Sequence, residues 1–397
     1  MKRVAVPLGP TRSPITSSSS SWYFWRAEPY KMNLLGNMTK KMCVFGALCC
    51  LLHMFIGTNF IQSLLIILVA FDVTGNILDM IWYFTPKHML PDIQDKVVIV
   101  TGCDTGFGHE FAKKLDSLGV LVFAGCLYSE GDGARALKDS CSDKLKIIQL
   151  DVTQDDQVEN AVKTVTSILE ETKQELWAVV NNAGILNPGE IDWTPIEVFH
   201  KIFDVNTLGQ VRVTKAFLSL LKKSKGRVVN VISVGGHFTF PLCVNYCMSK
   251  HALVSFSNGL RQELKKWFIS VHTIEPWGYR TSILNESQID SFCQNNWDNT
   301  SKTVQREYGE GYLDEVKRTI KEIMTSGAKP MSAVHEVVDA LTHATVGKDP
   351  KMCYVPSFAG FLLKVGLSIL PTELFNILMY NRFHKIDNSK PQSKKMK

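Results

Sequence analysis

Short runs of β-branched and other apolar residues recur along the middle of the chain and predict strands that are buried on both faces. The runs cover residues 96–101, 120–124, 145–150, 176–180, 227–233 and 270–275. Helical periodicity follows the first run, at residues 109–118. Continuously apolar strands that alternate with helices are typical of a parallel sheet covered by helices on both faces. The pattern therefore predicts an α/β protein built on a single doubly wound parallel sheet of the Rossmann type.

A long apolar stretch precedes this alternating pattern and predicts an N-terminal membrane anchor over residues 42–84. A bilayer core of ~30 Å needs about 20 helical residues. The apolar residues from 42 to 71 are numerous enough for one tilted span or for a tight helical hairpin. A buried pair of soluble helices is the alternative, and the lack of a polar face argues against it.

Charge and composition describe the rest of the chain. The sequence is 45% hydrophobic and 21% charged, which fits a globular domain over residues 85–383 with a full core. The net charge of +6 is concentrated at the two ends, in a disordered basic segment at 1–41 and a basic tail at 384–397. A surplus at the ends beside an apolar stretch indicates a membrane surface as partner, and no nucleic acid.

The ten cysteines are scattered, with no paired C-x-x-C spacing. Such a distribution fits neither a zinc cluster nor a small disulfide scaffold. We therefore expect mostly free thiols and no metal site.

A glycine-rich loop at residues 101–108 follows the first predicted strand and precedes the first helix. Gly102, Gly106 and Gly108 permit a tight turn and the close approach of a ligand, with Phe107 between the last two. The helix that follows would direct free N–H groups at a pyrophosphate. A purely structural turn is the alternative interpretation.

Further motifs occur in a fixed order along the chain. The sequence Asn-Asn-Ala-Gly at 181–184 follows the fourth predicted strand, and Asn206 lies in the next helix. Ser233 ends the fifth strand, and Tyr246 and Lys250 lie four residues apart on the helix after it. With the glycine spacing, this set resembles the short-chain dehydrogenase/reductase family over residues 96–383.

The spacing of Tyr246 and Lys250 fits the oxidation of an alcohol. A tyrosine serves as the base only if its pKa falls from ~10 toward neutrality, a change worth about 4 kcal/mol. One ammonium ~4 Å away contributes about that amount at an effective dielectric of about 20. We therefore expect Lys250, one turn after Tyr246, to lower the pKa of the phenol.

The resemblance implies a role for each residue. Tyr246 is the acid/base, Lys250 also holds the nicotinamide ribose, Ser233 hydrogen-bonds the substrate oxygen, and Asn206 anchors a water of the proton relay. The cofactor-binding residues that it implies are Gly102, Gly106, Phe107, Gly108, Asn182, Ala183, Gly184 and Thr281. The sequence departs from the family at Trp277, where a glycine is usual, and we expect this bulky residue to shift the loop that carries Thr281.

Charge favours NAD over NADP as the cofactor. A 2′-phosphate needs a basic residue near the end of the second strand or before the second glycine, and residues 104–105 and 126–128 contain none. A carboxylate at Asp104 about 6 Å away would repel the phosphate by ~3 kcal/mol at an effective dielectric of about 20. Asp104 is a candidate ribose ligand, and Asp151 with Val152 a candidate adenine contact. Asp151 as a helix N-cap is the alternative.

Local phrases at 100–104, 308–309 and 370–374 resemble the branch that holds retinol dehydrogenases, 17β-hydroxysteroid dehydrogenases and D-β-hydroxybutyrate dehydrogenase. Members of that branch are typically membrane-bound and NAD-linked. The substrate loop expected at 283–313 is rich in apolar residues, which fits a lipophilic alcohol such as a steroid or retinoid. The alternative is that these apolar residues only pack the lid against the body of the protein. Residues 358–380 would either dip into a bilayer or pack into the core.

We interpret the chain as a membrane-bound, NAD-dependent short-chain alcohol dehydrogenase, and the family resemblance adds a possible homodimer. The ending Lys-Lys-Met-Lys at 394–397 resembles an endoplasmic-reticulum retrieval signal, which favours the membrane of that organelle. Glycosylation acceptors at Asn285 and Asn299 favour a lumenal domain instead of a cytosolic one, so orientation stays open. The alternatives are a 3-hydroxybutyrate dehydrogenase of the mitochondrial inner membrane and a catalytically idle lipid-binding scaffold.

Overall fold

The computed structural model describes residues 43–51, 60–281 and 286–383, and the chain divides into two compact units at residues 1–79 and 80–397. In the first unit, residues 43–51 are helical and α2 (Phe60–Phe84) begins; α2 ends in the second unit. No helix within the described residues is long and apolar enough to cross a membrane. The anchor predicted over 42–84 is thus not found among them, and residues 42 and 52–59 of that prediction lie outside the description, as do the predicted segments 1–41 and 384–397.

The second unit is built on one parallel sheet, as predicted. Its strands are β1 (Val97–Thr101), β2 (Leu121–Cys126), β3 (Leu145–Gln149), β4 (Leu176–Asn181), β5 (Arg227–Val231), β6 (Ser270–Ile274) and β7 (Cys353–Tyr354). Their order is β3-β2-β1-β4-β5-β6-β7 and every pairing is parallel. The six apolar runs of the sequence are the first six strands. The seventh strand has only two residues, too few for a pattern to reveal it.

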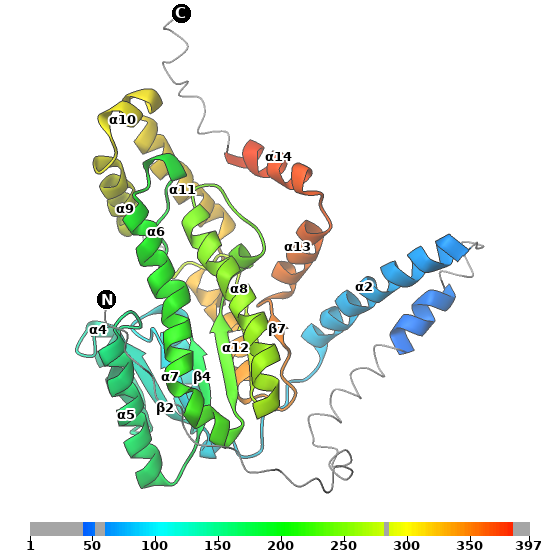
Figure 1. Ribbon diagram of the computed structural model, residues 1–397, viewed down its shortest axis with the longest axis vertical. Helices are drawn as coiled ribbons and strands as arrows, with labels where there is room; N and C mark the ends of the chain where they lie inside the picture. Colours follow the sequence, from blue (N-terminus) through cyan, green and yellow to red (C-terminus); the bar gives the residue numbers. More distant parts are fainter. Residues whose placement is uncertain (1–42, 52–59, 282–285, 384–397) are drawn as a thin grey trace, which may run out of the picture. The chain divides into compact units, whose positions relative to one another are not determined.

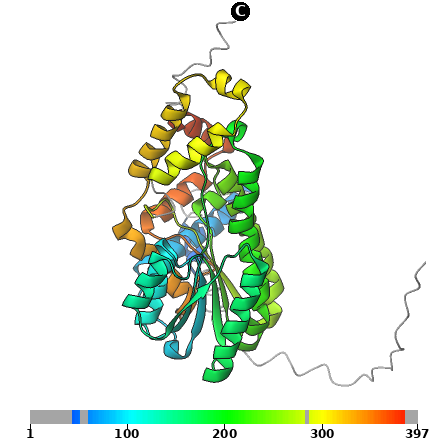
Figure 2. The same ribbon diagram turned by 90° about the vertical axis from the view of Figure 1, so that its left-hand side faces the viewer.

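Helices cover both faces of the sheet (Figures 1 and 2). The first helices in chain order are α3 (Gly106–Ser117), α4 (Asp132–Ser140), α5 (Asp155–Thr172), α6 (Ile196–Phe203), α7 (Gly209–Ser224) and α8 (Val244–Leu264). Those that follow β6 are α9 (Glu286–Asp298), α10 (Lys302–Tyr308), α11 (Tyr312–Gly327), α12 (His335–Val346), α13 (Phe358–Ser368) and α14 (Thr372–Phe383).

Strand β1 shows why this sequence makes a sheet with two buried faces. Val98 and Val100 point into a core shared with α3, α4 and α12, whereas Val97 and Ile99 point into a second core shared with α5 and α7. Successive side chains of a strand alternate between faces. An unbroken apolar run therefore supplies both cores at once, and the doubly wound interpretation is confirmed.

The last two helices are more exposed than the rest of the domain. Pro371 separates α13 from α14. Phe361 is buried, but Ile369 is 76% exposed and Ile377 55% exposed. Packing of residues 358–380 into the core, the alternative considered above, is therefore wrong for most of this stretch.

Candidate active site

The glycine loop joins β1 to α3 at the carboxyl edge of the sheet. Gly102 and Gly106 have positive φ angles of 70° and 65°, a conformation that favours glycine. A Cβ on Gly108 would lie 2.3 Å from the carbonyl oxygen of Gly102, so a side chain there is excluded. Phe107 lies in the first turn of α3 and packs edge-on against the ring of Tyr279. The three glycines leave no side chain of their own at the amino end of α3, so a pyrophosphate group could approach the backbone N–H groups there.

The Asn-Asn-Ala-Gly motif that follows β4 lies against this loop. The side-chain amide of Asn182 donates to the carbonyl oxygens of Thr101 and Gly102, at 2.9 and 3.0 Å. The backbone N–H of Ala183 donates to the Thr101 hydroxyl. A Cβ on Gly102 would meet the Ala183 backbone at 2.8 Å. β1 and β4 are the strands at which the strand order reverses, where doubly wound sheets bind their ligands.

Asp104 holds the turn that follows β2. Its two carboxylate oxygens accept hydrogen bonds from the backbone N–H groups of Leu127 and Tyr128, at 2.8 and 3.0 Å. The structure thus holds the Asp104 carboxylate at the end of β2, the position from which it would repel a 2′-phosphate. It also shows what the sequence could not, that this carboxylate already has two backbone donors.

Asp151 and Val152 lie where β3 leads into α5. The Asp151 carboxylate accepts hydrogen bonds from the backbone N–H and the hydroxyl of Thr153, so it closes a turn before the helix. The N-cap position of α5 is Gln154, and the N-cap interpretation of Asp151 is wrong by three residues. Val152 is buried in the core, and a Cβ on Gly209 of α7 would lie 2.6 Å from its methyl carbon. The adenine contact stays a prediction.

Ser233, Tyr246 and Lys250 are brought together beyond the end of β5. Ser233 accepts a hydrogen bond from the backbone N–H of Gly235, and a Cβ on Gly235 would lie 3.4 Å from the Ser233 hydroxyl and 3.5 Å from the Tyr246 ring. The Lys250 ammonium lies 5.5 Å from the centre of that ring and donates to the carbonyl of Val231. The helical spacing of Tyr246 and Lys250 thus places both groups on one side of α8, as predicted.

The electrostatics differ from the sequence-based expectation. Burial raises the pKa of Tyr246, and a hydrogen bond from Ser233 acts in the opposite direction. Burial also lowers the pKa of Lys250 to about 7, so its ammonium is only partly charged near neutrality. The expected lowering of the Tyr246 pKa by Lys250 is therefore wrong for the chain by itself, because desolvation affects both members of the pair.

Asn206 lies in a short π-helical segment, Asp204–Leu208, which the sequence did not reveal. Such bulges occur frequently at functional sites. The side-chain amide of Asn206 is fully buried and is fixed by the backbone of Ile185 and by the Ser249 hydroxyl. A Cβ on Gly184 would lie 3.3 Å from the Asn206 oxygen and 3.6 Å from the Lys250 ammonium, so Asn206, Gly184 and Lys250 share one small space.

The loop after β6 carries both Trp277 and Thr281. A Cβ on Gly106 would lie 3.6 Å from the Thr281 side chain, which places Thr281 beside the glycine loop. The Trp277 ring packs edge-on against Phe240. The carbonyl of Pro276 accepts hydrogen bonds from the hydroxyl of Ser233 and the backbone of Val234. Trp277 thus has a packing partner, and Thr281 still reaches the cofactor loop.

Residues that sequence reasoning missed hold this loop in place. The Tyr279 hydroxyl donates to Glu336 of α12 at 2.6 Å, and Lys329 forms an ion pair with the same carboxylate. The backbones of Arg280 and Lys329 are hydrogen-bonded. Lys329 and Glu336 lie about fifty residues after Tyr279 and Arg280 in the sequence, and no periodic signal links them, so only the fold reveals these contacts.

The helices of the predicted substrate lid form a separate apolar cluster. The rings of Trp297, Tyr308 and Tyr312 pack against one another, edge-on or tilted, and Trp297 also packs against Trp193 of the body. The alternative, in which the aromatic residues pack the lid against the body, is therefore observed for these side chains. Residues 282–285 at the start of the lid lie outside the described residues.

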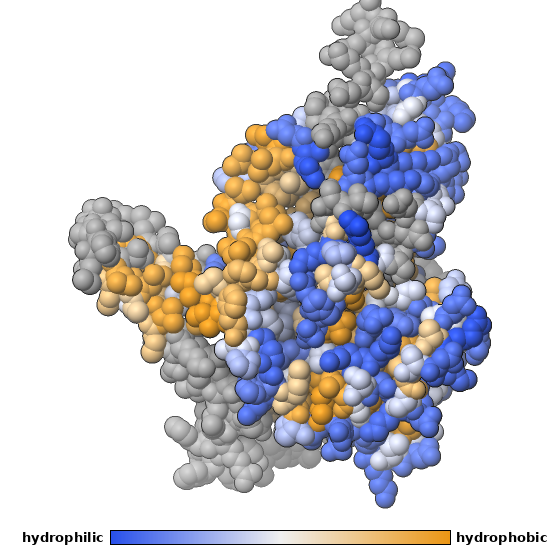
Figure 3. Space-filling model, turned by 180° about the vertical axis from the view of Figure 1, so that it is seen from behind, coloured by the Kyte–Doolittle hydropathy of each residue, from blue (hydrophilic) through white to orange (hydrophobic). Residues whose placement is uncertain are grey.

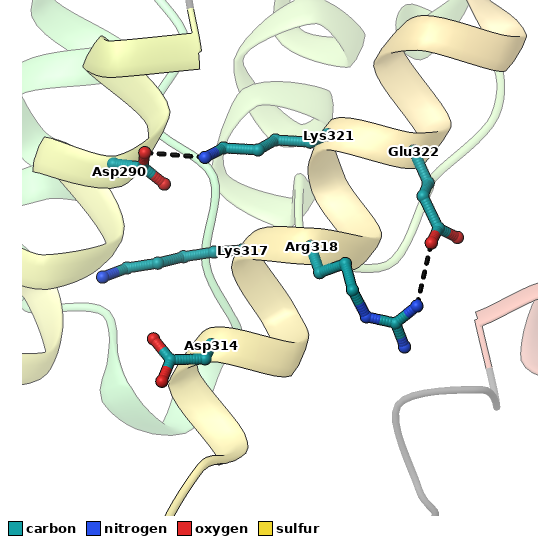
Figure 4. A pocket seen from close by; sticks show the side chains of 6 residues that line it. All are labelled: Asp290, Asp314, Lys317, Arg318, Lys321 and Glu322. Carbon is teal, nitrogen blue, oxygen red and sulfur yellow. Dashed lines mark hydrogen bonds and ion pairs between the residues drawn. The ribbon is translucent and has the colours of Figure 1, made fainter.

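A hollow of about 630 Å³ between α9 and α11 is a separate feature (Figure 4). It is lined by Asp290, Asp314, Lys317, Arg318, Lys321 and Glu322. Figure 4 shows Asp290 paired with Lys321 and Arg318 paired with Glu322. This charged lining fits no lipophilic substrate and includes none of the predicted site residues. Among the described residues, no group of three or more His, Cys, Asp or Glu side chains could hold a metal ion.

The family model for short chain dehydrogenases matches residues 96–291. The chain is 39% identical to the estradiol 17-beta-dehydrogenase 2 of Mus musculus, over 75% of this chain and 77% of that protein. Taken with the sheet and the Ser233, Tyr246 and Lys250 arrangement, this places the chain in the short-chain dehydrogenase/reductase family of oxidoreductases. The predicted family membership is confirmed.

Two further relatives mark the range of the family that this chain resembles. It is 40% identical to the mitochondrial D-beta-hydroxybutyrate dehydrogenase of Rattus norvegicus, over 66% of this chain and 76% of that protein. It is 34% identical to retinol dehydrogenase 7 of Mus musculus, over 75% of this chain and 92% of that protein. These are the three enzyme types that the local phrases of the sequence resemble.

Solved structures with the same fold carry both dinucleotides. A short-chain dehydrogenase from Burkholderia phymatum, in complex with NAD, superimposes with a TM-score of 0.55 over 70% of this chain and 96% of its own, at 20% identity. One from Burkholderia cenocepacia J2315, in complex with NADP, gives a TM-score of 0.51 over 71% and 96%, also at 20% identity. The likeness confirms the fold.

Proposed function

We propose that the protein is a membrane-bound oxidoreductase that transfers a hydride between NAD and a primary or secondary alcohol of a lipophilic substrate, a steroid or a retinoid. The observation that carries the proposal is the assembly of Ser233, Tyr246 and Lys250 beside the glycine loop. The glycines at the amino end of α3 and the fixed Asp104 fit a dinucleotide.

The chain's own residues handle the proton and the substrate oxygen. NAD, when bound, supplies the hydride acceptor. Tyr246 takes the hydroxyl proton of the alcohol, and the Ser233 hydroxyl stabilises the charge that builds on the substrate oxygen. Lys250 holds the nicotinamide ribose, and its charged form favours the ionised phenol. Asn206, fixed by three hydrogen bonds with the backbone of Ile185 and the Ser249 hydroxyl, anchors the water through which the proton leaves.

The preference for NAD follows from charge at the end of β2. Asp104 is fixed at this edge by two backbone donors, and neither Cys126, Leu127 nor Tyr128 is basic. A 2′-phosphate would approach an anion there with no cation to neutralise it. NADP is the less favourable cofactor.

Membrane attachment is supported by the surface of α13 and α14. Apolar side chains gather along these two helices in Figure 3. The most exposed include Leu362, Leu363, Ile369, Leu374, Ile377 and Leu378. The basic segment 384–397 follows them directly in the sequence, which favours an anionic lipid surface. We place the protein at the endoplasmic-reticulum membrane. Exposed Leu208 and Met248, next to Asn206 and Tyr246, support a homodimer through α7 and α8.

The test is incubation of the purified, detergent-solubilised chain with NAD or NADP and each of retinol, estradiol, androstanediol and 3-hydroxybutyrate. We expect NADH formation with a retinoid or steroid and slower turnover with NADP. Turnover of 3-hydroxybutyrate alone would favour the mitochondrial alternative. Reduction of neither dinucleotide with any alcohol would contradict the proposal and favour an idle scaffold.

A further inference from the structure

A cluster of three ionisable side chains, with a buried carboxylate at its centre, lies next to the segment that carries Ser233. Glu275 directly follows β6, and only 4% of its side chain is exposed. One of its carboxylate oxygens lies 2.9 Å from His237 Nε2 and 2.5 Å from the Lys364 ammonium. The other accepts a hydrogen bond from the Thr273 hydroxyl. The chemistry proposed above uses none of these groups.

The cluster closes a ring around Ser233. His237 directly follows η4 (Val234–Gly236), the turn that begins after Ser233. Glu275 directly precedes Pro276, whose carbonyl accepts hydrogen bonds from the Ser233 hydroxyl at 3.4 Å and from the backbone of Val234 at 3.1 Å. The carboxylate of Glu275 therefore joins both ends of the segment that fixes the Ser233 hydroxyl.

The third member of the cluster comes from a distant part of the chain. Lys364 lies on α13, and its side chain is 23% exposed. The same helix carries Leu362 and Leu363 on its exposed surface. α13 thus presents an apolar surface outward and one ammonium inward to the carboxylate.

The charges of this cluster depend on one another. Burial alone would raise the pKa of Glu275, but the hydrogen bond from His237 and the charge of Lys364 outweigh it and lower the pKa to about 2. Glu275 is therefore an anion throughout the working pH range. Removal of one partner of a buried ion pair leaves a poorly compensated charge, which the surrounding segment relieves by moving.

We propose that Glu275, Lys364 and His237 are positioning residues that hold Ser233 against Tyr246 and couple α13 to the active site. The proposal rests on the proposed function, because it assigns these residues a part in the same reaction. Since the hydrogen bond from Ser233 lowers the pKa of Tyr246, a displaced Ser233 also changes the pH at which the phenol ionises.

The test compares Lys364→Met and Glu275→Gln with a matched control, Lys96→Met. Lys96 also forms an ion pair, with Asp92, and its side chain is 16% exposed, but it lies at the amino end of β1, away from the site. In alcohol oxidation we expect kcat to fall about tenfold in Lys364→Met and Glu275→Gln. This decrease is smaller than the one expected when a hydrogen-bond donor to the substrate oxygen is deleted, because Ser233 is displaced and still present. The acidic limb of the pH profile moves upward by roughly half a unit. We expect Lys96→Met to leave both kcat and the position of the acidic limb unchanged. Lys364→Arg should keep most of the wild-type value of each.

Hydrogen exchange provides a reading that needs no substrate. We expect the peptide spanning residues 230–240 to exchange faster in Lys364→Met and Glu275→Gln than in the wild type or Lys96→Met. A uniform loss of rate with an unmoved limb, or unchanged exchange in this peptide, would overturn the proposal. If the wild type oxidises none of the alcohols, the proposed function fails, and the exchange result still decides whether the cluster holds the Ser233 segment.

Discussion

Two lysines near the same active site are held in opposite electrostatic surroundings. Lys250 on α8 is 3% exposed, donates to a backbone carbonyl, and has no carboxylate partner among the described residues. Lys364 on α13 is less buried and forms an ion pair with Glu275. Burial without a carboxylate partner makes the charged form of Lys250 costly to the fold, which fits its proposed catalytic role, whereas the charge of Lys364 is matched, which fits its proposed positioning role. The absence of a carboxylate partner for Lys250 among the described residues is the feature that points to a role in the reaction.

The largest effect is expected at the base that Lys250 supports. Tyr246→Phe removes the phenol next to Ser233 without changing the shape of the ring, so we expect kcat/KM for alcohol oxidation to fall by at least about a thousandfold. Circular dichroism and cofactor binding should stay as in the wild type. Near-normal NADH formation by this variant would refute the role of Tyr246.

Lys250→Met sharpens the comparison with Lys364→Met. Loss of the unpaired ammonium should lower kcat/KM by about a hundredfold or more, and it should raise the KM for NAD because the ribose loses its donor. Lys364→Met should lower kcat alone, by about tenfold. Steady-state kinetics of both variants against NAD separate the two behaviours, and equal effects on KM would break the comparison.

Ser233→Ala removes the hydroxyl that, in our proposal, links the Glu275–Lys364 ion pair to Tyr246. We expect kcat to fall by about a hundredfold, as for other removed donors to a developing oxyanion. The hydrogen bond with Ser233 lowers the pKa of Tyr246, so we expect that pKa to rise in the variant. Because the ionised phenol is the active base, the acidic limb of the oxidation profile should move to higher pH. A pH–rate profile with the limb unmoved would contradict the link between Ser233 and Tyr246.

Asp104→Asn tests the charge argument for the cofactor. The amide can still accept from one of the two backbone donors, while the negative charge is gone. We expect the preference for NAD over NADP, measured as a ratio of kcat/KM values, to shrink by about tenfold. An unchanged ratio would mean that Asp104 only holds the turn.

The smallest effect is expected for Asp151→Asn. If Asp151 contacts the adenine, the KM for NAD should rise by a few-fold with kcat unchanged. The turn that Asp151 makes with Thr153 survives in part, since asparagine accepts the same hydrogen bonds. An unchanged KM would leave Asp151 with the structural role alone.

The fold could be predicted from the sequence, and the candidate site residues could be found in it, because their signals are local. The apolar run at residues 97–101, the glycines after it, and the four-residue spacing of Tyr246 and Lys250 each lie within one element or its end. The direction of the Tyr246 pKa was predicted wrongly, because burial of both side chains is a property of the whole fold.

Interactions between distant elements could not be predicted. The pairing of Glu275 with Lys364 joins residues eighty-nine positions apart, and that of Tyr279 with Glu336 joins residues fifty-seven apart. β7 is too short to show a period, and the π-helical segment around Asn206 has the same apolar pattern as an ordinary helix.

The most direct test of an unpaired, buried Lys250 is the stability difference between the wild type and Lys250→Met as a function of pH. The pKa of Lys250 is about 7 in the folded chain and 10.5 when unperturbed. Between these values the unfolded state binds the extra proton, so the stability of the wild type relative to the variant rises with pH. Urea unfolding should show Lys250→Met more stable than the wild type at pH 7, with an advantage that shrinks steadily toward pH 10. A difference that does not change with pH would contradict the account.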